Sequence, residues 1–157
     1  MSLEDRIQNV RKVIDFLLDI DPTAINVQDN EGNMPYHYAN EYFSPRGKRY
    51  TAVFILPCNR GADASICNKR KETPLHTFLR SRSCEPFDTD AIATLLCHGA
   101  EVTDADDNGN APLHLAASRL HQVRAASFLL QHGANPATRN SKFETSLHRA
   151  GGVISVE

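Results

Sequence analysis

The tetrapeptide Thr73-Pro74-Leu75-His76 decides the fold of this 157-residue chain, because related tetrapeptides stand at three other places. They are Met34-Pro35-Tyr36-His37, Ala111-Pro112-Leu113-His114 and Thr145-Ser146-Leu147-His148. A Gly-Ala dipeptide recurs with them, as Gly61-Ala62, Gly99-Ala100 and Gly133-Ala134. From each of these glycines to the next repeated histidine the distance is 15 residues. Self-similarity at a fixed period of this length predicts a stack of repeated structural units.

The second unit indicates how each repeat begins. Thr73 is suited to cap a helix, because its hydroxyl can accept a hydrogen bond from an unpaired amide of the first turn. Pro74 then falls at the first helical position, where its missing N–H has no cost. Leu75, Phe78 and Leu79 form an apolar stripe at helical spacing. A first helix is therefore predicted directly after Thr73.

A second helix is predicted near Thr89 to Cys97, and Gly99 stands where a left-handed residue ends a helix. Residues 100–108 have no helical period and are rich in aspartate, which favours an extended loop or hairpin. Neither helix of such a unit can bury its apolar face alone. When units are stacked, each one buries its apolar face against its neighbours. The sequence therefore predicts a solenoid.

Further motifs identify a resemblance. The hexapeptide Ala111-Pro112-Leu113-His114-Leu115-Ala116 resembles the Thr-Pro-Leu-His-x-Ala signature of ankyrin repeats, whose period is about 33 residues. An Asp-x-x-Gly pattern precedes the motif at residues 29–32 and 106–109. The resemblance to the ankyrin-repeat family covers about residues 8–150. It implies an all-α solenoid of stacked helix-turn-helix repeats with extended hairpin loops.

We expect a single domain with an incomplete repeat at each end. The predicted repeats span residues 8–28 (partial), 29–67, 68–105, 106–139 and 140–157 (partial). At the N-terminal end, residues 10–18 resemble a second helix with no first helix before it. At the other end, a helix that includes His148 is expected to stop at Gly151-Gly152. These half-repeats suggest the hypothesis that the chain is a piece of a longer repeat array.

The departures from the repeat pattern carry information as well. Histidine-to-histidine spacings exceed the family's period, and the extra length lies between each histidine and the next glycine. Two insertions, at residues 41–50 and 80–90, are expected in the loops that join the paired helices. We also predict that Asn33 and Asn110 take over part of the capping role that threonine has elsewhere, and that Pro57 shortens or kinks its helix.

Bulk properties exclude several classes of function. The net charge of −2 provides no basic field for nucleic acid or a membrane surface. No apolar run is long enough to span a bilayer, and the first residues lack the apolar centre of a signal peptide. The four cysteines form no Cys-x-x-Cys pair, so we expect reduced, mostly buried thiols. Together these features predict an intracellular protein, cytoplasmic or nuclear, without a cofactor.

Catalysis and metal binding are not expected either. His37, His76, His114 and His148 each occupy one position per unit, so stacking spaces them apart, and the resemblance implies that they bond to backbone near the hairpins. No phosphate-binding loop, nucleophile elbow or His-Glu-x-x-His motif is present. The acidic residues between Glu101 and Asp107 do not have the spacing of a calcium loop. We interpret them as a solvated hairpin tip.

The remaining function is surface recognition. In ankyrin-like proteins the hairpin tips and inner helices line a concave face that usually binds proteins. The resemblance assigns the following candidate partner-binding residues: Glu31, Asn33, Glu41, Tyr42, Lys69, Arg70, Glu72, Arg80, Asp107, Asn108, Asn110, Ser118, Arg119 and Lys142. The expected partner is another protein or a peptide segment, and no small-molecule substrate is expected.

Two alternatives stay open. The chain can be a regulatory or targeting segment of a larger multidomain enzyme. It can also be a weak binder of nucleic acid or anions, through the basic insertion Arg46, Lys48 and Arg49 together with residues 69–71. Because the second tip is basic and the third acidic, a partner of mixed charge is favoured over the uniformly charged backbone of a nucleic acid.

Overall fold

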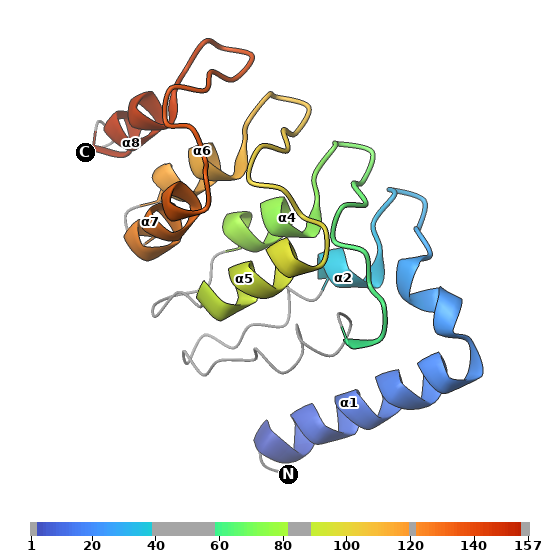
Figure 1. The fold of residues 1–157 in the computed structure, drawn as a ribbon. Coiled ribbons are helices and arrows are strands. Elements are labelled where there is room, and N and C mark those ends of the chain that lie inside the picture. Colours follow the sequence, from blue (N-terminus) through green and yellow to red (C-terminus); the bar gives the residue numbers. More distant parts are fainter. Residues whose placement is uncertain (1–2, 39–58, 82–88, 120–121, 155–157) are drawn as a thin grey trace.

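The structure, a computed structural model, describes residues 3–38, 59–81, 89–119 and 122–154 (Figure 1). All secondary-structure elements within these ranges are helical, which confirms the predicted all-α solenoid. They are α1 (Leu3–Ile20), the 3-10 helix η1 (Pro22–Asn26), α2 (Pro35–Tyr38), α4 (Pro74–Arg80), α5 (Thr89–Cys97), α6 (Pro112–Ala117), α7 (Val123–Gln131) and α8 (Ser146–Ile154).

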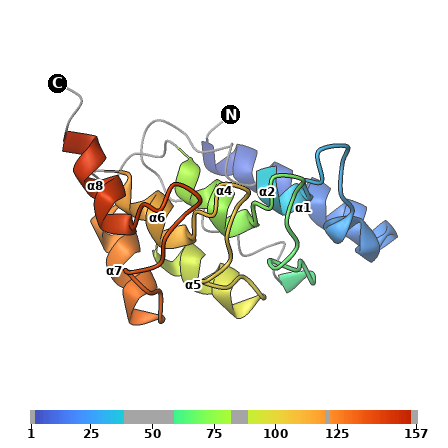
Figure 2. The ribbon, with the colours of Figure 1, turned by 90° about the horizontal axis from the view of Figure 1, so that it is seen from above.

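The helices form two layers. In the inner layer α2 contacts α4, α4 contacts α6, and α6 contacts α8; in the outer layer α5 contacts α7. Within a unit, α4 packs on α5 and α6 packs on α7. Figure 1 shows the loops that project side by side along one edge of the stack, one before each inner helix, and Figure 2 shows the same stack from above. The inner helices and these loops are the surfaces on which the sequence analysis placed the expected partner-binding residues.

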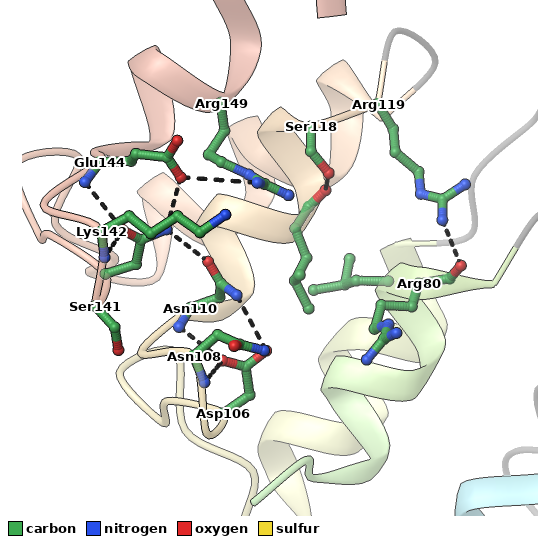
Figure 3. Close-up of a pocket in the computed structure, with 13 residues that line it drawn as sticks. Arg80, Asp106, Asn108, Asn110, Ser118, Arg119, Ser141, Lys142, Glu144 and Arg149 are labelled. Carbon is green, nitrogen blue, oxygen red and sulfur yellow. Dashed lines mark hydrogen bonds and ion pairs between the residues drawn. The ribbon is translucent and has the colours of Figure 1, made fainter. Parts of the chain in front are cut away.

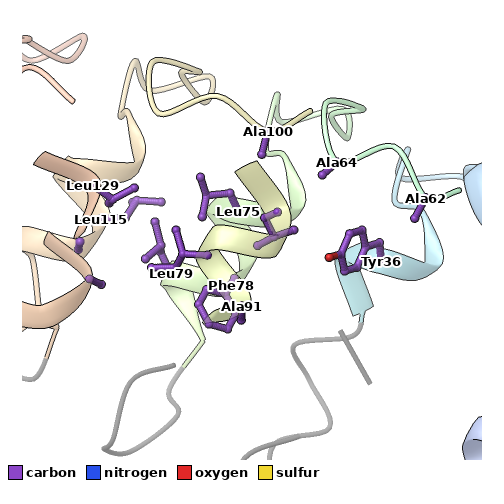
Figure 4. Close-up of a cluster of buried hydrophobic side chains, with 14 of the residues drawn as sticks. Tyr36, Ala62, Ala64, Leu75, Phe78, Leu79, Ala91, Ala100, Leu115 and Leu129 are labelled. Carbon is purple, nitrogen blue, oxygen red and sulfur yellow. The ribbon is translucent and has the colours of Figure 1, made fainter. Parts of the chain in front are cut away.

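The core runs along the stack rather than around one centre. Leu75, Phe78 and Leu79 of α4 are buried, and so are Leu95 of α5 and Leu129 of α7. Figure 4 shows Leu75, Phe78, Leu79 and Leu129 between successive helices. Complete burial of one such side chain contributes roughly 1.5–3 kcal/mol. Because each apolar face is covered by the neighbouring unit, a unit buries its apolar side chains only when it stacks on that neighbour.

The predicted helix boundaries of the second unit agree with the structure. Proline is the first residue of α2, α4 and α6, and α5 spans Thr89–Cys97 as expected. Gly99, just beyond α5, has a φ of +105°, a backbone conformation that glycine adopts without strain. The proline and glycine pattern therefore identified the helix starts and the chain reversal.

The predicted helix caps were wrong in detail. The Asn33 side chain bonds to the Tyr38 hydroxyl and to Asn68, and the Asn110 side chain bonds to Asp106 and Asn140; none of these bonds involves a helix amide. The Thr73 hydroxyl likewise bonds to the His76 ring, 2.9 Å away. The backbone amide at the cap position instead donates to the histidine Nδ1, over 3.2 Å at Thr73 and 3.1 Å at Ala111. This bond satisfies the amide of the cap residue itself and needs no side-chain hydroxyl, and it is present where the cap residue is Ala111.

The predicted end of the last helix was also wrong. Helix α8 continues through Gly151 and Gly152 to Ile154. Glycine in a helix costs about 1 kcal/mol relative to alanine, but it does not prevent the helical conformation. At the other end, α1 is longer than residues 10–18, and an ion pair joins its Asp15 to Arg60, 3.2 Å away.

Several sequence predictions fall outside the described residues. Pro57 and the insertion at 41–50 lie there, as do residues 82–88 of the second insertion; α4 ends at Arg80 and α5 begins at Thr89. Cys67 and Cys97 can be assessed, and both are free thiols. They are exposed, however, and not buried as predicted. Cys67 lies in the segment directly before the second hairpin loop, and Cys97 is the last residue of α5.

Candidate partner-binding site

Each unit begins with a five-residue loop, which we call a tip: residues 29–33, 68–72, 106–110 and 140–144. In every tip the side-chain oxygen of the first residue accepts hydrogen bonds from the amides of the third and fifth residues. In the second tip, for example, Asn68 Oδ1 lies 2.9 Å from the Arg70 amide and 3.0 Å from the Glu72 amide. These hydrogen bonds fix the shape of the tip and do not involve the side chains of its second and third residues.

Backbone hydrogen bonds join each tip to the next. The amide of the second residue donates to the carbonyl oxygen of the third residue in the preceding tip. The three bonds are Lys69 N–Glu31 O at 3.0 Å, Asp107 N–Arg70 O at 3.0 Å and Ser141 N–Asn108 O at 2.9 Å. Because main-chain atoms make these joints, the side chains at both positions remain available to a partner.

The repeated histidines form a second set of joints. His76 accepts from the Thr73 amide through Nδ1, so its proton is on Nε2, which donates to the Asn110 carbonyl oxygen at 3.1 Å. His37 bonds to the Glu72 carbonyl oxygen at 2.9 Å, and His114 to that of Glu144 at 3.1 Å. Each ring therefore connects a helix start with the tip of the following unit.

Burial affects the protonation of two of these rings. It lowers the pKa of His37 to about 4 and lowers the pKa of His76 as well. Burial disfavours the charged imidazolium, and a second ring proton would also remove the Nδ1 acceptor. His37 and His76 are thus neutral hydrogen-bonding groups at neutral pH.

Two predicted partner-binding residues are buried instead. Glu72 is 1% exposed and pairs with Arg70 and Arg80, while Asn110 is 8% exposed and bonded to Asp106 and Asn140. Both occupy the fifth position of a tip, which faces the neighbouring unit. Sequence position alone suggested an accessible tip, but the side chains of this position stabilise the stack.

A pocket of about 420 Å³ is lined by residues of the second, third and fourth units (Figure 3). Its walls come from the ends of α4 and α6, from α8 and from the third and fourth tips. The lining residues are Leu79, Arg80, Asp106, Asn108, Asn110, Leu115, Ser118, Arg119, Asn140, Ser141, Lys142, Glu144 and Arg149. Six of them belong to the predicted set, so the structure brings nearly half of that set into one concavity.

The pocket has an excess of positive charge. Four of its lining residues are cations, Arg80, Arg119, Lys142 and Arg149, whereas two are acidic, Asp106 and Glu144. Figure 3 shows that these cations come from three different units.

Both acidic side chains of the pocket are already hydrogen-bonded. Asp106 accepts hydrogen bonds from the backbone amides of Asn108 and Asn110 and from the side-chain amide of Asn110. It is therefore a buried residue that holds the tip in shape, and not a solvated one as predicted. Glu144 accepts from Asn140 at 3.0 Å, and this bond, with smaller contributions from Arg149 and Lys142, lowers its pKa. Glu144 therefore stays ionised and offsets part of the positive charge of the pocket, which still has more cations than carboxylates.

The other predicted residues lie elsewhere. Glu31, Lys69, Arg70 and Asp107 are exposed on the first three tips but do not line this pocket. Asn33 is half-buried and accepts from Asn68 at 2.9 Å. The remaining predicted positions, Glu41 and Tyr42, lie outside the described residues, as do the basic residues Arg46, Lys48 and Arg49.

Two residues of interest were missed from the sequence. Arg149 lines the pocket from α8, and the repeat pattern gave no reason to select it. Phe143, in the fourth tip, is 74% exposed and has a φ of +61°. Gly32 and Gly109 hold the corresponding place in the first and third tips. The second tip has Lys71 there, with a φ of +56°. A phenylalanine at a position that carries glycine in two of the other three tips was the sequence feature that could have identified it.

Comparison with known proteins identifies the repeats. The family model "Ankyrin repeats (3 copies)" matches residues 43–140. Intracellular phospholipase A2 of Caenorhabditis elegans is 27% identical over 96% of this chain, which spans 14% of that protein. Neurogenic locus notch homolog protein 1 of Danio rerio is 36% identical over 78% of this chain, here 5% of the relative. Ankyrin repeat and SOCS box protein 11 of Danio rerio is 42% identical over 41% of this chain and 22% of its own length.

The chain therefore spans less than a quarter of the length of each of these relatives. Among the described residues, no helix is both long enough and apolar enough to cross a membrane.

Proposed function

Because this chain belongs to the ankyrin-repeat family, we propose that it is a non-catalytic protein-interaction module that binds its partner in the pocket lined by the second, third and fourth units. The observation that carries the proposal is the concentration of predicted recognition residues there, among them Asn108, Ser118 and Lys142. A volume of about 420 Å³ suits side chains of a peptide segment. Around it, backbone and histidine joints hold the walls in place.

Site-specific photocrosslinking tests this proposal. A benzophenone amino acid replaces Asn108, whose exposed side chain lines the pocket, or as a control Ser127, which is exposed on α7 outside the pocket lining. Each protein is irradiated in an extract of cells that naturally produce the chain. We expect discrete protein adducts from position 108 and not from position 127. Adducts from position 127 alone would show that the partner uses another face.

A second candidate is suggested by one comparison. The resemblance to the phospholipase A2 covers nearly all of this chain but only 14% of that protein. An ankyrin array of this kind can serve as the regulatory or targeting segment of a larger intracellular enzyme. The length of the native gene product distinguishes the two candidates: a product of about this length, with no catalytic domain, excludes the second.

A further inference from the structure

We propose that the pocket selects a partner segment rich in carboxylate side chains, and that Phe143 provides an aromatic contact next to it. This inference rests on the proposed function and adds the chemistry of the partner. It starts from the charges of the pocket, from one buried donor without a partner, and from the backbone conformation of the fourth tip.

The cations of the pocket are incompletely neutralised. Arg80 is paired with Glu72, but Arg119 and Lys142 have no ion pair with a carboxylate in the part of the chain that the structure describes. Arg119 donates instead to the backbone carbonyl of Arg80. The pocket thus holds two cations for which a partner can supply the counter-charge.

Arg149 adds an unused donor. Its Nη1 is 3.7 Å from Glu144, a long distance for an ion pair, and its buried Nε has no hydrogen-bond partner among the described residues. A buried donor without an acceptor costs about 1–3 kcal/mol. A guanidinium presents paired donors that match the two oxygens of a carboxylate. An entering Asp or Glu side chain can satisfy Arg149 and at the same time approach Lys142.

The charges around the pocket favour an acidic protein segment over a nucleic acid. A uniformly charged phosphate backbone that follows the tips would meet Glu144 in the pocket and Asp107 on the third tip. A peptide can place a carboxylate at the cations and a neutral or basic residue at Asp107. The net charge of −2 also opposes a long polyanion.

Phe143 supplies an independent observation. It follows Lys142 and precedes Glu144, so it stands at the edge of the pocket, with most of its ring exposed. Its left-handed backbone conformation is unfavourable for any residue with a side chain. A strained, exposed aromatic residue is typical of a binding contact, because folding alone would favour glycine there.

Selection from a random display library tests the carboxylate assignment. Twelve-residue peptides are selected on the wild-type chain, on Arg119→Ala/Arg149→Ala and on the control Arg124→Ala, an exposed cation of α7. We expect at least threefold enrichment of Asp and Glu on wild type and on the control, but not on the double variant. A wild-type selection without acidic enrichment, including one that returns no binders, overturns the proposal.

Fluorescence anisotropy with the best peptide provides the second measurement. Changing its acidic residues to Gln or Asn should weaken binding at least tenfold, and so should the double variant, whose folding is checked by thermal unfolding. Phe143→Gly should raise the melting temperature yet weaken peptide binding at least threefold. A phosphoserine peptide that binds more tightly than its glutamate counterpart would identify phosphate as the ligand and overturn the carboxylate assignment.

The two proposals can fail separately. If the crosslinker at position 108 captures a partner segment without acidic residues, the pocket is the binding site but the carboxylate assignment is wrong. If the only adducts form from position 127, the proposed function itself fails.

Discussion

The Nε2 atom of His76 lies 3.1 Å from the carbonyl oxygen of Asn110, so a buried ring of one unit is hydrogen-bonded to the tip of the next. The same ring accepts from Thr73 at the start of its own helix. One neutral imidazole therefore fixes both the beginning of α4 and the distance to the following unit. This dual role makes the repeated histidine a determinant of stability.

Replacing His76 with alanine should reduce the free energy of unfolding by about 2–4 kcal/mol, because the Thr73 amide and the Asn110 carbonyl lose a buried partner. His148→Ala is the matched control. The His148 ring is exposed, and its hydrogen bonds to described residues reach only Thr145 of its own unit. We expect a loss below about 1 kcal/mol there. Urea unfolding measures the free energy of unfolding of both variants. Equal losses would contradict the role of His76 in joining two units.

Stability should fall with acid over a defined pH range. Burial lowers the pKa of His37 to about 4, whereas an unfolded chain's histidines titrate near 6.5. Below pH 6.5 the unfolded chain therefore binds protons that the folded ring does not. The stabilisation is complete above pH 6.5 and is lost as the pH falls toward 4, by an amount on the order of 2 kcal/mol.

Denaturant unfolding at pH 7.5 and 4.5 measures this loss. The variant His37→Gln should depend less on pH over this interval, whereas a change at the exposed His132 should leave the dependence intact. The explanation fails if wild type and His37→Gln lose the same stability.

Gly109→Ala should be more destabilising than Gly133→Ala. Both glycines have positive φ, +71° and +92°, so either alanine is strained by about 1–2 kcal/mol. A Cβ at position 109 would also lie 2.8 Å from the Ser141 amide nitrogen, whereas a Cβ at 133 meets no atom within 4 Å. The melting temperatures of the two variants are compared. The additional loss in Gly109→Ala reports the close contact between the third and fourth tips. A larger loss for Gly133→Ala would contradict the close approach.

Glu72→Gln should increase the affinity of the pocket for an acidic peptide. The substitution keeps an acceptor for Asn68 but removes the carboxylate that pairs with Arg80 and Arg70. Release of Arg80 adds a cation to the pocket, and we expect about two- to fivefold tighter binding at low salt. Arg70→Gln removes a charge near Glu72 but outside the pocket lining, and serves as the control. Unchanged affinity in Glu72→Gln would show that Arg80 does not reach the ligand.

The sequence was sufficient for the repeat and for most helix boundaries, because proline at helix starts and glycine at reversals act locally. It was insufficient where neighbouring units decide the outcome. Glu72 reads as an exposed charge next to two other charged residues, yet it is buried. Its side chain bonds to Asn68 and Arg80, and its carbonyl oxygen is bonded to His37 of the preceding unit. The continuation of α8 through Gly151-Gly152 was missed because two weak helix formers were treated as a stop.

The candidate pocket could be predicted only in part. Arg119 and Lys142 were selected by their place in the repeat, and both line it. Arg149 was not, because its importance depends on the packing of α8 beside α6 and on a buried Nε that no sequence pattern reveals. The fourth tip shows the opposite case, since Phe143 stands out by simple alignment with Gly32 and Gly109.

The main-chain joints between tips have a consequence for how such a module can diversify. Carbonyl and amide groups of residues such as Arg70, Asp107 and Asn108 maintain the spacing of the tips whatever side chains these residues carry. Mutations there can alter partner choice while the free energy of unfolding stays nearly constant. Selection for a new partner then acts on the side chains of these residues, whereas selection for a stable fold acts on their main-chain atoms. Recognition can therefore evolve without intermediates that fail to fold.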